Sequence, residues 1–144
     1  MLRATNPADR GTVLMMFPAA VLIMFMLGAI VVDVSLTQVR ARELQAIASS
    51  AANDSLAALD IAALRNDGTL VIDERQAELI VADAIAAGPL PESTVNAVVI
   101  DTDSLGRLQI SVTLTYTVDL VMAPAVGDLD RVTLVRTGRA VVVG

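Results

Sequence analysis

The sequence predicts an α+β chain: a long N-terminal helix, transmembrane in its first half and amphipathic in its second, packed on a small antiparallel sheet with one further short helix. Three observations predict it. An uncharged apolar run fills residues 11–32, small apolar residues follow it at helical spacing, and period-two strands occupy the C-terminal half. The expected parts are a tail (1–10), a transmembrane helix (11–32), an amphipathic helical extension (33–66) and an α+β domain (67–144).

The apolar run has the length of a membrane helix. As a helix, residues 11–32 rise roughly 33 Å, enough to cross a hydrocarbon core of about 30 Å. A signal peptide has a shorter apolar stretch and a small-residue cleavage site, and no A-x-A pattern precedes Asp33. We therefore expect a retained membrane helix, with a cleaved signal and a buried core helix as alternatives.

Four residues of this region are candidates for helix packing. Pro18 removes one helical hydrogen bond, which a neighbouring helix can compensate, and Gly28 with Ala29 leaves a smooth patch for a close approach. Both features are also common in membrane helices without such a role. Asp33 marks the exit from the membrane at the headgroup level or, alternatively, pairs with a partner inside a membrane assembly.

The orientation follows from the size of the two flanks. Ten residues are too few for a domain, and a short basic tail normally stays in the cytoplasm. We expect residues 1–10 on the cytoplasmic side of a bacterial cytoplasmic membrane and residues 67–144 outside it.

The helix is expected to continue past the membrane as a single element of some fifty residues. Neither Pro nor Gly occurs between Ala29 and Gly68, and "Asn66-Asp67-Gly68" predicts its end. The alternative is two helices with a break near Asp33 or Ser49-Ser50. One face carries apolar residues suited to packing on a sheet or on another helix: Leu44, Ala48, Ala52, Leu56, Leu59 and Ala63.

The C-terminal half predicts one short helix among strands. Residues 69–72 are a strand candidate, and Asp73 caps a helix that ends at Gly88-Pro89. The apolar face of this helix is expected to contain Leu79, Ile80, Ala84 and Ile85.

Three further strands complete the sheet. Residues 95–101 lead to a turn at Asp103 and Gly106, residues 109–122 alternate over seven apolar positions, and residues 131–143 form the last strand. The alternation of the last strand slips near Gly138, which predicts a β-bulge there. The second half of the long helix is expected to cover the apolar face.

Composition argues against most chemistry. The chain has neither Cys nor His, so thiolate, imidazole and the usual zinc sites are excluded. Its carboxylate pairs fall at turns and helix starts, where Asp is an ordinary capping residue, and no phosphate-binding glycine loop occurs. The acidic body, with Tyr116 as its one aromatic residue, suits neither nucleic acid nor stacking. We expect no catalytic, cofactor-binding or metal-binding residue and no small-molecule substrate.

A family resemblance rests on several segments together. Arg10-Gly11 precedes the run, Pro18 follows seven residues after the glycine, and three further segments keep order and spacing: "AIVVD" (29–33), "RELQ" (42–45) and "AANDSLAA" (51–58). Over roughly residues 10–60 the chain resembles the TadE/TadG-like proteins of Flp-type (tight adherence) pilus systems. The resemblance implies a non-enzymatic, bitopic, pilin-like protein whose partners are the cytoplasmic membrane and other pilus assembly subunits.

The same resemblance makes Gly11 a candidate processing site. Pseudopilin-type members are cut after a glycine and carry Glu five residues beyond it, where this chain has Met16. The departure makes the chain more similar to the TadG-like branch, which stays anchored. Two alternatives remain open: an anchored extracytoplasmic module that binds a ligand or partner unrelated to pili, and a secreted domain behind a cleaved signal.

Overall fold

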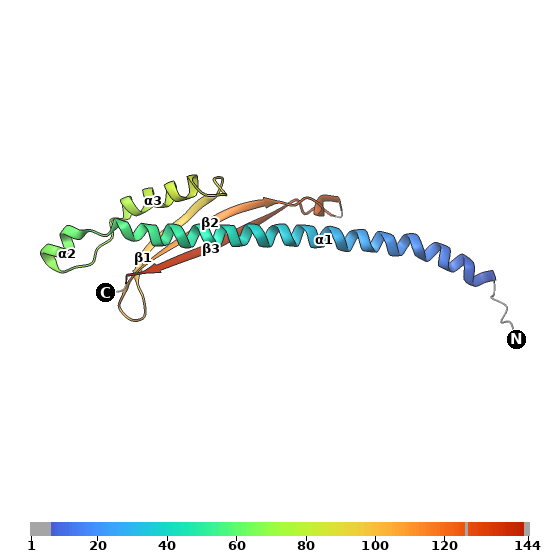
Figure 1. The fold of residues 1–144 in the computed structure, drawn as a ribbon, viewed down its shortest axis with the longest axis horizontal. Coiled ribbons are helices and arrows are strands. Elements are labelled where there is room, and N and C mark those ends of the chain that lie inside the picture. The colour runs from blue at the N-terminus through green and yellow to red at the C-terminus, as the bar shows by residue number, and fades with distance from the viewer. Residues whose placement is uncertain (1–6, 126, 143–144) are drawn as a thin grey trace. The chain divides into compact units, whose positions relative to one another are not determined.

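The long helix and the sheet of the predicted α+β fold are both present (Figure 1). A computed structural model describes residues 7–125 and 127–142, with the side chains of residues 16–124 and 127–142; residues 1–6 of the expected tail, Val126 and Val143-Gly144 lie outside this description. The elements in order are α1 (Pro7–Asp54), the 3-10 helix η1 (Ser55–Ala58), α2 (Ile61–Asp67), α3 (Glu74–Ala86), β1 (Thr94–Thr102), β2 (Leu108–Asp119), the 3-10 helix η2 (Ala123–Ala125) and β3 (Arg131–Val141).

The chain forms two compact units. The first combines Met1–Leu36 with Leu120–Asp130, and the second combines Thr37–Asp119 with Arg131–Gly144. Helix α1 contributes its first half to one unit and its second half to the other. The second unit contains the sheet, and the first contains the apolar run.

The helical extension is interrupted, so the prediction of one unbroken helix to Asp67 is wrong. Leu59 has extended backbone angles (φ −67°, ψ 126°), and Asp60 starts α2 by accepting hydrogen bonds from the amides of Ala62 and Ala63 at 2.8 and 3.0 Å. The break therefore lies at residues 59–60, and neither alternative position matches it. The predicted end is confirmed, because Gly68 closes α2 in the left-handed conformation (φ 65°).

The break exists because the chain turns back on itself. Leu59 forms an isolated antiparallel bridge with Ile72, flanked by hydrogen bonds from Asp60 N to Val71 O (2.8 Å) and from Asp73 N to Ala58 O (2.9 Å). Residues 69–72 therefore make one bridge, and the strand predicted there is absent. A strand of the sheet would need a neighbour along its whole length.

Helix α3 starts as predicted, and its predicted apolar face is confirmed in part, because Ile85 is buried and Ile80 and Ala84 are half-buried. The side chain of Asp73 accepts a hydrogen bond from the amide of Gln76 at 3.1 Å, which confirms the cap. Leu79, predicted to be buried, is exposed, and α3 packs against η1 and β1. The buried residues of α3 are Ala77, Val81 and Ile85.

The sheet is antiparallel, as predicted, and its strand order is β1-β2-β3. The alternation of β2 is confirmed, although the strand ends at Asp119, before the predicted Met122. Its buried residues are Ile110, Val112, Leu114 and Val118. The turn before β2 is also confirmed: Gly106 has φ 77°, and Asp103 accepts from the amides of Leu105 and Arg107 at 2.9 Å each.

The bulge predicted at Gly138 is absent, since β3 pairs with β2 in an unbroken register from Arg131 to Val141. Arg136 and Gly138 both lie on the inner face, so the alternation continues through a charged residue. A Cβ at position 138 would overlap the carbonyl of Ala48 and the amide of Ser49. The glycine therefore permits backbone contact between α1 and β3. The register irregularity lies in β1, between Val95 and Ala97.

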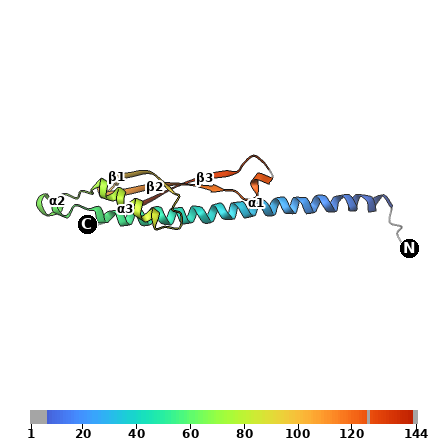
Figure 2. The ribbon, with the colours of Figure 1, turned by 90° about the horizontal axis from the view of Figure 1, so that it is seen from above.

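The second half of α1 covers the apolar face of the sheet, as predicted. Figures 1 and 2 show the three strands side by side with this part of the helix running along them. Gln45 Nε2 donates a hydrogen bond to the carbonyl of Thr137 at 3.1 Å, beside the Gly138 contact. The buried residues of α1 in this unit are Leu44, Ile47, Ala48, Ala51 and Ala52.

The substitution Gly138→Ala tests this contact. We expect it to lower the free energy of unfolding by about 3 kcal/mol, because the added methyl meets backbone atoms that cannot move aside as a side chain would. Thermal unfolding of the full chain in detergent, followed by circular dichroism, measures the loss. Gly127→Ala, where a Cβ has no neighbour within 4 Å, is the control and should change stability by less than about 0.5 kcal/mol. Equal stability of the two variants would contradict the contact.

Candidate functional site

The first unit exposes the apolar run of α1. Large apolar side chains from Met16 to Val34 face outward around the helix, and Phe25 is 74% exposed. Within the described residues, one helix is long and apolar enough to cross a membrane. By its length and composition this exposed helix is compatible with a membrane span or a signal anchor near the N-terminus.

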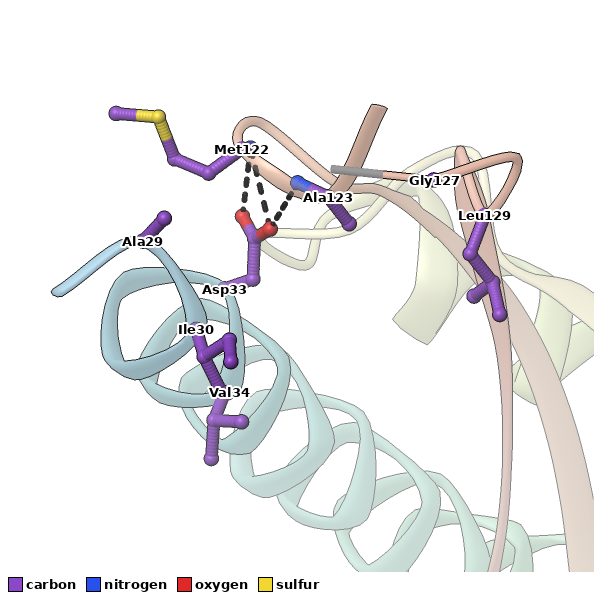
Figure 3. A pocket seen from close by; sticks show the side chains of 8 residues that line it. All are labelled: Ala29, Ile30, Asp33, Val34, Met122, Ala123, Gly127 and Leu129. Atoms are coloured by element: carbon purple, nitrogen blue, oxygen red, sulfur yellow. Dashed lines mark hydrogen bonds between the residues drawn. The ribbon is translucent and has the colours of Figure 1, made fainter. Parts of the chain in front are cut away.

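Asp33 lies immediately after this run and binds a loop that is distant in sequence. Its carboxylate accepts hydrogen bonds from the amides of Val121 (2.9 Å), Met122 (3.1 Å to each oxygen) and Ala123 (2.6 Å). Figure 3 shows the side chain pointing from the helix to the amides of Met122 and Ala123. The residue is only 6% exposed. We call the Asp33 carboxylate and these three amides the Asp33 clasp.

The local fold of the loop explains why three consecutive amides converge. Leu120 N donates to Asp130 O at 2.8 Å and closes the base of the loop. The 3-10 helix η2 then starts at Ala123, followed by Pro124, and Gly127 N donates to Ala123 O at 2.9 Å. The first amides of a helical turn lack partners within it. A carboxylate supplied by α1 satisfies them and complements their partial positive charge.

The hydrogen bonds also favour the charged form of Asp33. Desolvation of the carboxylate raises its pKa, and the hydrogen bonds from Val121, Met122 and Ala123 lower it by more. The net result is a pKa below the usual value of 3.8 for this residue, which lies outside the apolar run 11–32. Asp33 is therefore ionised at neutral pH, and its bonds to the loop are charge-assisted.

An apolar hollow of about 270 Å³ lies beside the clasp. Apart from Asp33 it is lined by apolar residues and glycine: Ala29, Ile30 and Val34 from α1, and Met122, Ala123, Gly127 and Leu129 from the loop. Among the described residues that line the hollow there is neither a nucleophile nor a second titratable group, so its walls suit apolar packing rather than acid–base chemistry. Among the described residues, no cluster of three or more Asp or Glu side chains is arranged to hold a metal ion.

The predicted packing residues fall into two groups. In the first unit, Pro18 and Gly28 are exposed and Ala29 lines the hollow, while Gly11 lies within α1. In the second unit, the predicted stripe is used inside the chain, where Leu44, Ala48 and Ala52 are fully buried and Leu56 is half-buried. The apolar run is therefore where α1 exposes most of its large apolar side chains, whereas its second half exposes polar residues such as Arg42, Ser50 and Asp54.

Sequence analysis missed the clasp because the partners of Asp33 are backbone amides. Val121 and Met122 were expected in a strand and Ala123 in a connection. Backbone amides exist at every non-proline position and give no sequence signal. The only available hint was an acidic residue directly after an apolar run, which more often marks a membrane boundary.

Comparisons with protein-family models, curated proteins and solved structures returned no match.

Replacing Asp33 with Ala should release the loop. The amides of Val121, Met122 and Ala123 lose their acceptor, so peptides covering residues 120–130 should exchange hydrogen about ten times faster or more. Hydrogen exchange with mass spectrometry on the full chain in detergent measures this. Asp128→Asn, which removes an exposed carboxylate of the same loop, is the control and should leave exchange unchanged. Unchanged exchange in Asp33→Ala would show that the clasp does not hold the loop.

The lowered pKa of Asp33 predicts how the clasp responds to acid. A group whose pKa is lower in the folded chain stabilises it fully above the usual value of 3.8, and this stabilisation is lost as the pH falls through the lower folded-state value. A carbon-13 titration of the Asp33 carboxyl should therefore have its midpoint below 3.8, with the amide resonance of Ala123 shifting in parallel. In Asp33→Asn that amide should not titrate. A midpoint at or above 3.8 in the native chain would contradict the charge-assisted clasp.

Proposed function

We propose that this chain is a membrane-anchored, non-enzymatic, pilin-like component of a Flp-type pilus assembly or related secretion apparatus, of the TadE/TadG-like kind. It acts through helix–helix and domain–domain packing with other subunits. Helix α1 crosses the bacterial cytoplasmic membrane once, with the N-terminus inside and the sheet-bearing body outside.

The observation that carries the proposal is the difference in burial between the two halves of α1. In the second half of this helix, Leu44, Ala48 and Ala52 are buried and cover the sheet. The first half keeps its large apolar side chains exposed from Met16 to Val34. Each square ångström of apolar surface left in water costs about 25 cal/mol, so this half is expected to be covered by lipid and by neighbouring helices.

The Asp33 clasp supports a retained anchor over a cleaved signal. Cleavage near Val34 would remove Asp33 and leave the amides of Val121, Met122 and Ala123 without their acceptor. Part-buried amides without an acceptor are destabilising, so a mature form that starts there would be less stable than the uncut chain. Gly11 lies far enough upstream that cleavage after it would preserve the clasp.

An anchored binding module is the second candidate, and one groove favours it. A hollow of about 450 Å³ in the second unit is lined by α1 and the end of α3, with polar side chains at Glu43, Ser50 and Asp54. A gene neighbourhood without a pilus ATPase would favour this candidate over pilus assembly.

Deleting residues 11–32 tests the anchor. We expect the full chain in the membrane fraction, resistant to carbonate extraction, and the deletion variant in the soluble fraction, because the exposed apolar segment is gone. The same deletion should abolish pilus assembly in the source cells. As a matched control, Gly138→Ala weakens the second unit but should remain in the membrane fraction.

Three results bear on the alternatives. A full chain found soluble in the cytosol would contradict the anchor. N-terminal sequencing of the membrane-extracted protein should give the uncut terminus, whereas a start at Thr12 would mean prepilin-type processing and a start near Val34 a signal peptide. Normal pilus assembly after the deletion would contradict the role in pili and leave the anchor standing.

A further inference from the structure

The loop Leu120–Asp130 carries exposed apolar side chains of its own. Val121 is 63% exposed, Met122 41% and Leu129 60%. A single exposed apolar side chain is ordinary, but three in an eleven-residue loop form a local apolar surface. We call these three side chains the loop tip.

The loop tip continues the apolar surface of the helix. The clasp fixes the loop against Asp33, one residue past the run, and Met122 and Leu129 line the same hollow as Ala29 and Ile30. Ile30 and its neighbours up to Val34 are themselves exposed. Met122 and Leu129 of the loop therefore share an apolar lining with Ala29, Ile30 and Val34 at the end of the run.

We propose that the loop tip inserts into the interfacial region of the bilayer that α1 crosses, as a second membrane contact beside the helix. This inference rests on the membrane anchoring proposed above. The position of the loop along α1 supports this proposal. If residues 11–32 fill the hydrocarbon core, residues 29–34 and the loop held beside them lie at the edge of that core.

The hydrogen bonding of the loop suits a place with little water. Backbone amides at membrane depth must find partners inside the protein. The amides of Val121, Met122 and Ala123 are bonded to Asp33, and Pro124 has no amide hydrogen. Leu120 N and Gly127 N are bonded to carbonyls of the loop itself. The amides of residues 120–123 and 127 therefore have partners inside the protein.

The charges of the loop limit the depth of insertion and identify the type of lipid contact. Asp128 and Asp130 are exposed and belong at the headgroup level, so the tip enters only the interface. The loop contains neither Lys nor Arg, so attraction to anionic lipids contributes nothing to it. The contact is apolar, and zwitterionic lipid should be sufficient for it.

The absence of cysteine makes the test direct. Single-cysteine variants of the full chain, Val121→Cys and Leu129→Cys, are labelled with an environment-sensitive fluorophore and reconstituted in phosphatidylcholine vesicles. Phosphatidylcholine with a spin label high on the acyl chain should quench about half of the fluorescence or more at both positions, as for residues roughly 5–10 Å below the headgroup boundary. Phe25→Cys reports on the anchor, and Leu105→Cys, exposed in the β1–β2 turn, is the control that should not be quenched.

Quenching at the different labelled positions distinguishes the possible outcomes. Quenching at Phe25 without quenching at Val121 and Leu129 would overturn the loop insertion while the anchor holds. Absence of quenching at Phe25 as well would overturn the anchor itself. A loop signal that depends on the protein-to-lipid ratio and not on the spin label would mean that a second copy covers the tip, which also overturns the proposal. Quenching at Leu105 equal to that at Leu129 would indicate non-specific adsorption and count against it.

Asp33→Ala provides an independent test of the geometry. If the clasp holds the tip in the interface, this variant should lose most of the quenching at Leu129 and keep it at Phe25. Full quenching at Leu129 in the variant would show that the loop partitions into lipid without being positioned by the helix, and would overturn the proposed role of the clasp.

Discussion

The hydrogen bonds between the Asp33 carboxylate and three consecutive amides are the interaction on which the first unit depends. They solve two problems together, because a charge next to an apolar helix needs donors and the first amides of η2 need an acceptor. Without the carboxylate, these three part-buried amides would lose their acceptor. Met122, Ala123, Gly127 and Leu129 of the same loop line the neighbouring apolar hollow.

The second unit depends on a different constraint, the contact of backbone with backbone at Gly138. The small residues Ala48 and Ala52 let the backbone of α1 approach the sheet closely. Gly138 in β3 lacks the Cβ that would prevent this approach. Helix and strand therefore share a close-packed core without large side chains at the crossing. One helix thus serves as the core helix of a sheet at one end and exposes a membrane-length apolar segment at the other.

Much of the fold could be predicted because its signals are local. The alternation of β2, the turn at Asp103 with Gly106, and the caps at Asp73 and Gly68 each depend on residues within a few positions of one another. The features that the sequence did not predict depend on residues that lie far apart in the chain. The break at Leu59 depends on Ile72, and the role of Gly138 depends on Ala48. The clasp joins Asp33 to amides about ninety positions away that have no sequence signature.

The most direct test of the account is to detect the clasp in solution through its hydrogen bonds. Scalar couplings across hydrogen bonds, measured by NMR on the isotope-labelled full chain in micelles, connect a donor nitrogen to the acceptor's carbon. The account predicts couplings from the Asp33 side-chain carboxyl carbon to the amide nitrogens of Met122 and Ala123, with the strongest to Ala123, whose bond is the shortest at 2.6 Å. Failure to observe them, in a spectrum that resolves the couplings across β2 and β3, would contradict it.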